Sequence, residues 1–214
     1  MSSRFNVMST RENRALLQER FPRQFAPRLR STAGFTLVEL MVVVSLLAIL
    51  MGLAAPSFAR LAKAAAISSA VNQFLADMRF ARSEAVRRGG GVVLCRSEDP
   101  ESAEPTCSSS LDSAGWASGW IVFNDINGNG ERNPDEGLIR IQARQTGVES
   151  IATGGTPTVF RFGATGRLLA PGPIASLQFG GSNVEADIRR VVCVNAGGRA
   201  RLAGNGSATC GAEG

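Results

Sequence analysis

The stretch DINGNGERNPDE carries oxygen-bearing side chains at the spacing of a calcium-binding loop. Asp125, Asn127, Asn129 and Glu136 occupy ligand positions of that pattern, and Gly130 stands at its sharp turn. A strand-like stretch precedes the loop where a helix is expected, two ligands are neutral amides, and an arginine replaces the usual apolar residue. An Asn/Gly hairpin loop without metal is therefore the favoured interpretation, and calcium is the alternative.

Other catalytic chemistry finds little support. The chain has no histidine, so the usual general base at neutral pH and the commonest metal ligand are both absent. The serines around Ser108 therefore cannot form a serine–histidine pair, and the scattered carboxylates suggest no acid–base pair. The sequence predicts a protein that is not an enzyme and uses no cofactor.

The four cysteines are Cys95, Cys107, Cys193 and Cys210, and none belongs to a CxxC pair. Their spacings do not suit a four-cysteine zinc site. An even number downstream of an apolar segment favours disulfides in an oxidising compartment. Three pairings are open. The polar, proline-broken stretch between Cys95 and Cys107 is predicted to be a loop closed by a disulfide, and a Cys193–Cys210 bond would brace the C-terminal loop.

An apolar helix precedes all of these residues. Residues 35–59 carry one charge, Glu39, and about 25 residues are enough to cross a hydrocarbon core of about 30 Å. A signal peptide would have a shorter apolar region. Residues 1–34 supply the whole net charge of +5, so they should stay cytoplasmic and the rest of the chain should lie outside. Pro56 is expected to kink the helix.

The helix is predicted to continue as an amphipathic half over residues 59–89, giving about 50 helical residues that end at Gly89–Gly91. Its apolar face is expected to contain Phe58, Leu61, Ile67, Val71, Phe74 or Leu75, Met78 and Val86. The polar face is expected to contain Lys63, Asp77, Arg79, Arg82, Glu84 and Arg87.

Short strands in an antiparallel arrangement are predicted beyond Gly91. They are Val92–Arg96, Gly119–Phe123, Leu138–Ala143, Thr158–Phe162, Ser176–Phe179 and Arg190–Val194. Trp116, Trp120 and Phe123 are expected in the core of the sheet.

A basic leader, Gly34 followed by Phe35, the stretch TLVEL, and an apolar helix together resemble the N-terminal signal of type IV pilins and type II secretion pseudopilins. The resemblance implies cleavage between Gly34 and Phe35 by a prepilin peptidase, and N-methylation of Phe35. The leader is long for that family, and Met8 is an alternative start. A buried Glu39 would be costly alone, but the new amine of a neighbouring subunit can pair with it in a filament.

The rest of the chain resembles the GspH/FimT group of minor pilins through MRFARSEAVRRGGGVVLC, GWIVFNDINGNGERNPDEGLIR and FGATGR. The implied fold is α+β and pilin-like, with a long N-terminal helix packed on antiparallel sheet. Its parts would be a cleaved leader (1–34), a transmembrane and assembly half of the helix (35–58), an amphipathic half (59–89) and a β-rich periplasmic head (90–214). The protein would be an inner-membrane single-pass subunit whose partners are other pilins.

The stretch from Gly198 to Arg201 resembles the GRxR element of DNA-binding FimT proteins. Residues two apart on an extended segment point the same way, so Arg199 and Arg201 can grip neighbouring phosphates. Arg189 and Arg190 are expected to extend the patch, by sequence proximity alone. Without aromatic residues nearby, binding should be sequence-independent and salt-sensitive.

The predicted function is therefore a FimT-like minor type IV pilin, near the pilus tip, that holds DNA for natural transformation. One alternative is a GspH-like pseudopilin of type II secretion without DNA binding. Another is a plain single-pass membrane protein in which the bond after Gly34 stays intact.

Overall fold

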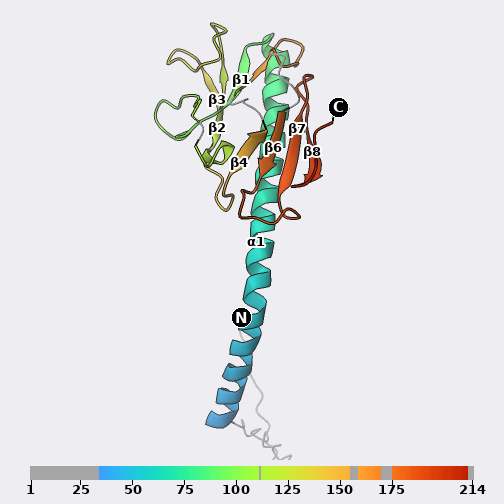
Figure 1. The fold of residues 1–214 in the computed structure, drawn as a ribbon. Coiled ribbons are helices and arrows are strands. Elements are labelled where there is room, and N and C mark those ends of the chain that lie inside the picture. Colours follow the sequence, from blue (N-terminus) through green and yellow to red (C-terminus); the bar gives the residue numbers. More distant parts are fainter. Residues whose placement is uncertain (1–33, 111, 155–158, 170–174, 212–214) are drawn as a thin grey trace, which may run out of the picture. The chain divides into compact units, whose positions relative to one another are not determined.

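The computed structural model describes residues 34–110, 112–154, 159–169 and 175–211 (Figure 1). Residue contacts divide the chain into one unit that ends at Leu46 and a second unit that begins at Leu47. Residues 1–33, which form nearly all of the predicted leader, lie outside the described residues, as does Thr158 at the start of one predicted strand.

Helix α1 spans Leu37–Arg88 and contains Pro56 without interruption. Its first turn is capped by Thr36, because the Thr36 hydroxyl oxygen accepts a hydrogen bond from the backbone N–H of Glu39 at 3.2 Å. Within the described part of the chain, α1 is the one helix long and apolar enough to cross a membrane. The predicted helix length and its end before the three glycines are confirmed.

A stripe of α1 at three- and four-residue steps is buried against the sheets. Five predicted members of the stripe are buried, namely Ile67, Val71, Phe74, Leu75 and Met78. The prediction was wrong for Phe58, Leu61 and Val86, which are 72%, 66% and 55% exposed. The first two precede the part of α1 that packs on the sheets, and the stripe ends on Ala81 and Ala85, one position away from Val86.

Two four-stranded antiparallel sheets follow α1, and Figure 1 labels most of their strands. The first has the order β3-β2-β1-β5, with β1 Val92–Arg96, β2 Trp120–Asn124, β3 Leu138–Gln142 and β5 Val159–Phe162. The second has the order β4-β6-β7-β8, with β4 Ile151–Gly154, β6 Ala175–Phe179, β7 Arg190–Val194 and β8 Ala200–Asn205. A short 3-10 helix, Trp116–Ser118, precedes β2.

These elements confirm a long N-terminal helix packed on antiparallel sheets, the pilin-like α+β fold. Each of the six predicted strands is present, with described ends shifted by one residue at most. The sequence did not reveal β4 and β8. The first is a four-residue strand that ends on a glycine, and the second is interrupted by a shift of register opposite Val191 and Val192.

Phe74 of α1 forms the centre of the main core. Its ring makes edge contacts with Trp116 and Trp120 at centroid distances of 5.6 and 5.5 Å. It also meets Phe160 of β5 at 6.2 Å and Phe179 of β6 at 5.8 Å. One helical side chain therefore contacts both sheets, and the predicted core role of the tryptophans is confirmed.

Asp77 was expected on the polar face of α1, but it is fully buried. Its carboxylate accepts hydrogen bonds from Trp120 Nε1 at 2.9 Å and from Arg140 Nη1 at 2.6 Å. Gln73 Nε2 donates to both carboxylate oxygens. Since Asp77 stands one position before Met78, it falls within the buried stripe, and its charge is tolerated because it is paired and hydrogen-bonded.

A second small core covers the opposite face of the first sheet. It contains Val93, Cys95, Ile121 and Phe123. The loop closed by the disulfide between Cys95 and Cys107 covers this core, so β1 is buried along its whole length. Arg96 anchors the loop through ion pairs with Glu98 at 3.1 Å and Asp112 at 3.0 Å.

Candidate functional sites

The turn that presents Arg199 depends on Gly198. Gly198 has a φ of 74°, and a Cβ there would stand 2.4 Å from the carbonyl oxygen of Gly166. Only glycine fits this close approach. Asn195 fastens the turn, because its side-chain oxygen accepts from Arg199 N at 3.0 Å and its carbonyl oxygen accepts from Gly198 N at 2.9 Å. Gly198 therefore shapes the turn between β7 and β8.

Arg199 and Arg201 lie on the outer side of the second sheet. Between them Ala200 packs against the main core, so residues one position to either side point the opposite way. Both arginines are exposed. Two extended residues span about 7 Å, which lets the two guanidiniums reach separate phosphates. The structure thus brings together the two predicted DNA-contacting residues.

The C-terminal disulfide supports this surface. Arg201 pairs with Cys193 across β7 and β8, so the side chains of both residues stand on the same face. Cys193 is bonded to Cys210, with their Cα atoms 5.6 Å apart. The chain that follows β8 is therefore tied back beside Arg201. Together with Cys95–Cys107, this bond confirms the predicted pairing of the four cysteines.

Arg189 and Arg190 lie away from this surface. Arg190 pairs with Asn205 at the other end of β7, about 10 Å along the strand from Cys193. Its Nη1 donates to the carbonyl oxygens of Asp187, Ile188 and Arg189. The Arg189 side chain is half-buried and points Nη1 toward Gln178 Oε1 at 3.5 Å. Neither guanidinium extends the patch formed by Arg199 and Arg201.

Arg167 is a candidate contact that the sequence did not reveal. It is exposed on the turn that contains Gly166. Leu168 N donates to Ala196 O at 3.1 Å, so this turn lies beside the turn of Arg199. Among the described residues, no ion pair includes Arg167 or Arg199. Arg167 ends the FGATGR stretch, for which the sequence predicted no DNA contact, and only the fold brings its turn beside the turn of Arg199.

The arginines at the end of α1 are engaged elsewhere. Arg87 Nη2 and Arg88 Nε bind Glu84 Oε2 at 2.6 and 2.8 Å. These hydrogen bonds lower the pKa of Glu84 to about 2. This local ion-pair cluster closes the C-terminal turn of the helix.

The predicted processing and assembly residues stand at the start of α1. A Cβ added at Gly34 would meet no atom of the described residues within 4 Å, so the packing of this part of the chain does not require glycine there. Phe35 is 84% exposed. Glu39 lies in the first helical turn and is exposed. Within the described residues no ion pair includes its carboxylate.

The four candidate calcium ligands share one loop between β2 and β3. Asp125 and Glu136 are buried, at 5% and 2% exposure. Asn127 and Asn129 are exposed on the loop between them. No group of three or more His, Cys, Asp or Glu side chains gathers at a metal-binding distance in the described ranges. Any cation here would therefore depend on amide and main-chain oxygens as well as the two carboxylates.

Two family models match the sequence. The model described as type II transport protein GspH matches residues 70–198, and the model of the prokaryotic N-terminal methylation motif matches residues 29–55. The first match covers α1 from Ala70 onward and the sheets as far as Gly198. The second includes Gly34, Phe35 and Glu39. A search of curated proteins finds no significant match.

Two solved structures resemble the fold. Both are of the type IV minor pilin FimU of Pseudomonas aeruginosa, in space groups P21 and P65. The first is 18% identical with a TM-score of 0.48, and the alignment covers 64% of this chain and 87% of FimU. The second is 19% identical with a TM-score of 0.46, covering 63% and 90%.

Proposed function

Because this chain belongs to the family of type II transport protein GspH and carries the prokaryotic N-terminal methylation motif, we propose that it is a minor type IV pilin that binds DNA. A prepilin peptidase cleaves between Gly34 and Phe35, and Phe35 is N-methylated. The apolar half of α1 anchors the subunit in the inner membrane, with the head in the periplasm. The subunit then joins other pilins near the tip of a filament and holds DNA for uptake.

Assembly rests on the start of α1. Gly34 makes no packing contact with the described residues that would require glycine, which supports recognition of this glycine by a processing enzyme. The Glu39 carboxylate is the only charge in the apolar half of the helix. An unpaired charge in hydrocarbon is costly. The amine created at Phe35 of a neighbouring subunit would offset that cost when the helices pack in a filament.

The observation that carries DNA binding is the placement of Arg199 and Arg201 on the outer face of the second sheet, with Arg167 on the adjoining turn. Arginine is suited to forked hydrogen bonds with phosphate. No aromatic residue is interleaved with these arginines between Arg189 and Ala203 in the sequence, so binding relies on the phosphate backbone. It should be independent of sequence and weaken steeply with salt.

The test compares DNA binding by the full chain and by an Arg199→Gln/Arg201→Gln variant in detergent. Duplex DNA of unrelated sequence is titrated at salt concentrations from about 50 to 200 mM. Loss of two phosphate contacts should flatten the slope of log K against log salt by about 2. Adding Arg167→Gln should flatten it further.

The matched control is Lys63→Gln/Arg144→Gln. Both side chains are exposed. Lys63 precedes Arg82, the residue of α1 that lies beside Gly166, by 19 residues, and Arg144 follows β3 at the edge of the first sheet, so the control removes the same charge from other surfaces. It should bind DNA as the unchanged protein does. Equal slopes for the unchanged protein and the Arg199→Gln/Arg201→Gln variant would refute the DNA interface.

A second candidate function is a pseudopilus subunit of type II secretion without a DNA role. The description of the matching family model favours it. The same titration separates the two candidates, because a pseudopilus subunit should show no specific contribution from Arg199 and Arg201.

A further inference from the structure

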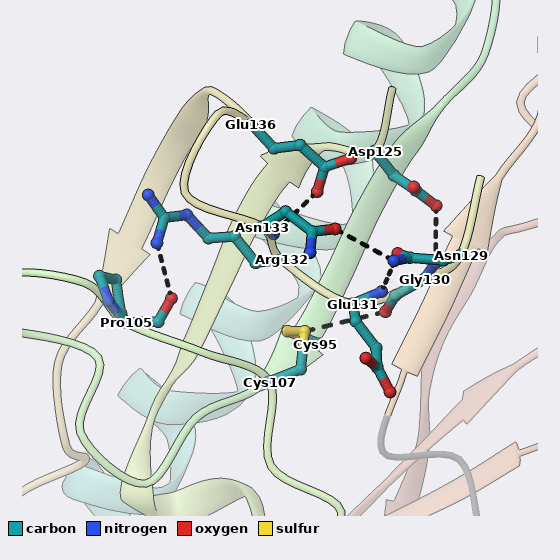
Figure 2. The surroundings of a disulfide bond; sticks show 10 residues. All are labelled: Cys95, Pro105, Cys107, Asp125, Asn129, Gly130, Glu131, Arg132, Asn133 and Glu136. Carbon is teal, nitrogen blue, oxygen red and sulfur yellow. Dashed lines mark hydrogen bonds between the residues drawn. A yellow bond between two sulfur atoms is a disulfide. The ribbon is translucent and has the colours of Figure 1, made fainter. Parts of the chain in front are cut away.

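The loop from Asp125 to Glu136 joins β2 to β3 and is held by its own carboxylates. Asp125 Oδ2 accepts from Gly130 N at 3.0 Å, and Gly130 has a φ of 81°. Glu136 Oε1 accepts from Ile126 N at 2.8 Å, and Glu136 Oε2 accepts from Asn133 N at 3.1 Å. Figure 2 shows both carboxylates turned toward the interior of the loop. The backbone is thus already curled around the two acids.

The two buried carboxylates of this loop have few ion-pair partners. Among the described residues, Glu136 takes part in no ion pair, and Asp125 has one distant partner, Arg161 Nη2 at 3.7 Å. Arg161 also donates from Nη2 to the carbonyl oxygen of Gly128. Asp125 Oδ1 is buried and accepts no hydrogen bond within the described structure. A buried carboxylate oxygen with no donor is costly and indicates a missing partner.

The remaining acceptor capacity lies on oxygen atoms around the loop. Asp125 Oδ1 keeps all its lone pairs, and Glu136 Oε2 keeps one after the bond from Asn133. The side-chain oxygens of Asn127 and Asn129 each accept a single backbone N–H, at 2.9 and 2.8 Å, so each keeps a lone pair. Several oxygens with open positions, among them those of two buried carboxylates, suit a hard cation.

We propose that this loop binds one Ca²⁺ ion. The ligands are Asp125, Asn127, Asn129 and Glu136 through their side chains and Glu131 through its carbonyl oxygen, at positions one, three, five, twelve and seven of the calcium-loop pattern. The strand that precedes the loop argued for a plain hairpin. The hydrogen bonds from Gly130 to Asp125 and from Asn133 to Glu136 reverse that preference, because they fold the chain without a flanking helix.

The chemistry of the ligands selects calcium over other metals. Histidine is absent from the sequence, and the nearby Cys107 is held in a disulfide, so the site offers only oxygen. Zn²⁺ prefers nitrogen and sulfur, and Mg²⁺ demands a compact octahedron. With two carboxylates and a guanidinium nearby, affinity should fall in the weak class of extracellular modules, with Kd of about 0.1–1 mM.

Calcium would also fasten the neighbouring disulfide loop. Arg132 Nη1 donates to Pro105 O at 3.0 Å, and Cys107 Sγ lies 4.0 Å from Gly130 O. Figure 2 shows the two loops facing each other at these contacts. Ordering the calcium loop should therefore stabilise the segment between Cys95 and Cys107. This role is independent of DNA binding.

The test is equilibrium dialysis of the full chain in detergent against radioactive Ca²⁺ after treatment with a chelator. We expect one ion per chain, with half-saturation at about 0.1–1 mM. The Tm of the chain should rise by about 4–8 °C at about 10 mM Ca²⁺. The same concentration of Mg²⁺ should raise Tm less. Absence of saturable binding up to about 10 mM Ca²⁺ would overturn the proposal.

Variants locate the ion. Glu136→Gln and Asp125→Asn should weaken Ca²⁺ at least about tenfold, whereas Glu131→Gln should not, because Glu131 contributes only its main chain. Arg161→Gln should tighten binding by removing a competing cation. Equal affinity in the unchanged protein and in folded Asp125→Asn would refute this location. If neither carboxylate variant folds, an unchanged Ca²⁺ affinity in Arg161→Gln, at a half-buried position, and in Asn127→Ala, at an exposed one, would refute it instead.

Discussion

Replacing Asp77 with alanine should be one of the most destabilising single changes in the head. Asp77 is fully buried and joins α1 to the first sheet through Trp120 and Arg140. The substitution leaves the buried Trp120 N–H without an acceptor, at a cost of about 1–3 kcal/mol. It also removes a charge-assisted bond to Arg140, at a cost of about 1.5–3 kcal/mol.

The cost of losing the bond to Arg140 should lie at the low end of that range, because the Arg140 side chain is 39% exposed and water can solvate its freed guanidinium. The expected loss in the free energy of unfolding is therefore about 3–4 kcal/mol, which corresponds to a fall in Tm of about 6–16 °C. Asp77→Asn keeps the shape and one acceptor, so its loss should be smaller.

The assay is denaturant and thermal unfolding of the full chain in detergent, with tryptophan fluorescence as the signal because Trp120 contacts Asp77. Asp135→Ala serves as the control, since Asp135 is exposed on a loop and should change stability by less than about 0.5 kcal/mol. A double-mutant cycle with Arg140→Gln should give a coupling of about 0.5–3 kcal/mol. A loss below about 1 kcal/mol for Asp77→Ala would refute a central role for this network.

Two further outcomes follow from the contacts. A Cys193→Ser/Cys210→Ser variant should lose about 2–4 kcal/mol in the free energy of unfolding, as measured by denaturant unfolding. It should also bind DNA less well in the salt titration. An unchanged stability and DNA affinity would show that the disulfide does not brace the surface. The pKa of Glu84 is lowered to about 2 by hydrogen bonds from Arg87 and Arg88, so its contribution to stability is present above pH about 4.3 and lost as pH falls toward 2. As pH falls from 5 to 2, Tm should fall less steeply in Glu84→Gln than in the unchanged protein. Equal slopes of Tm against pH in the two proteins would contradict the ion-pair cluster.

Local patterns in the sequence were enough to predict most of the fold. The apolar run after Glu39, the periodic face of the second half of α1 and the three glycines after Arg88 each follow from helix periodicity and capping. The strands around Val92 and Arg190 follow from runs of β-branched residues between turns. These signals act over a few residues, so one sequence can reveal them.

Contacts between distant segments could not be predicted in the same way. Asp77 looks like a surface residue because its charge signals solvent, and its partners lie 43 and 63 residues away in the chain. Arg167 joins Arg199 only because the backbone of one turn packs on the other. Conversely, Arg190 is close to the DNA-binding candidates in sequence but far along the strand, where carbonyl groups occupy its guanidinium. The register of β7 with β8 sets the position of Arg190, because Arg190 pairs with Asn205 whereas Cys193 pairs with Arg201.

The most direct test of a filament subunit matured at Gly34 is the intact mass and N-terminal sequence of the chain recovered from membranes of cells that contain a prepilin peptidase. The chain should begin at Phe35 and carry one added methyl group on its amine. The same measurement on Gly34→Ala, a change that clashes with no atom among the described residues, should give the uncut precursor. A membrane form of the unchanged protein that keeps the residues before Phe35 would contradict the pilin assignment.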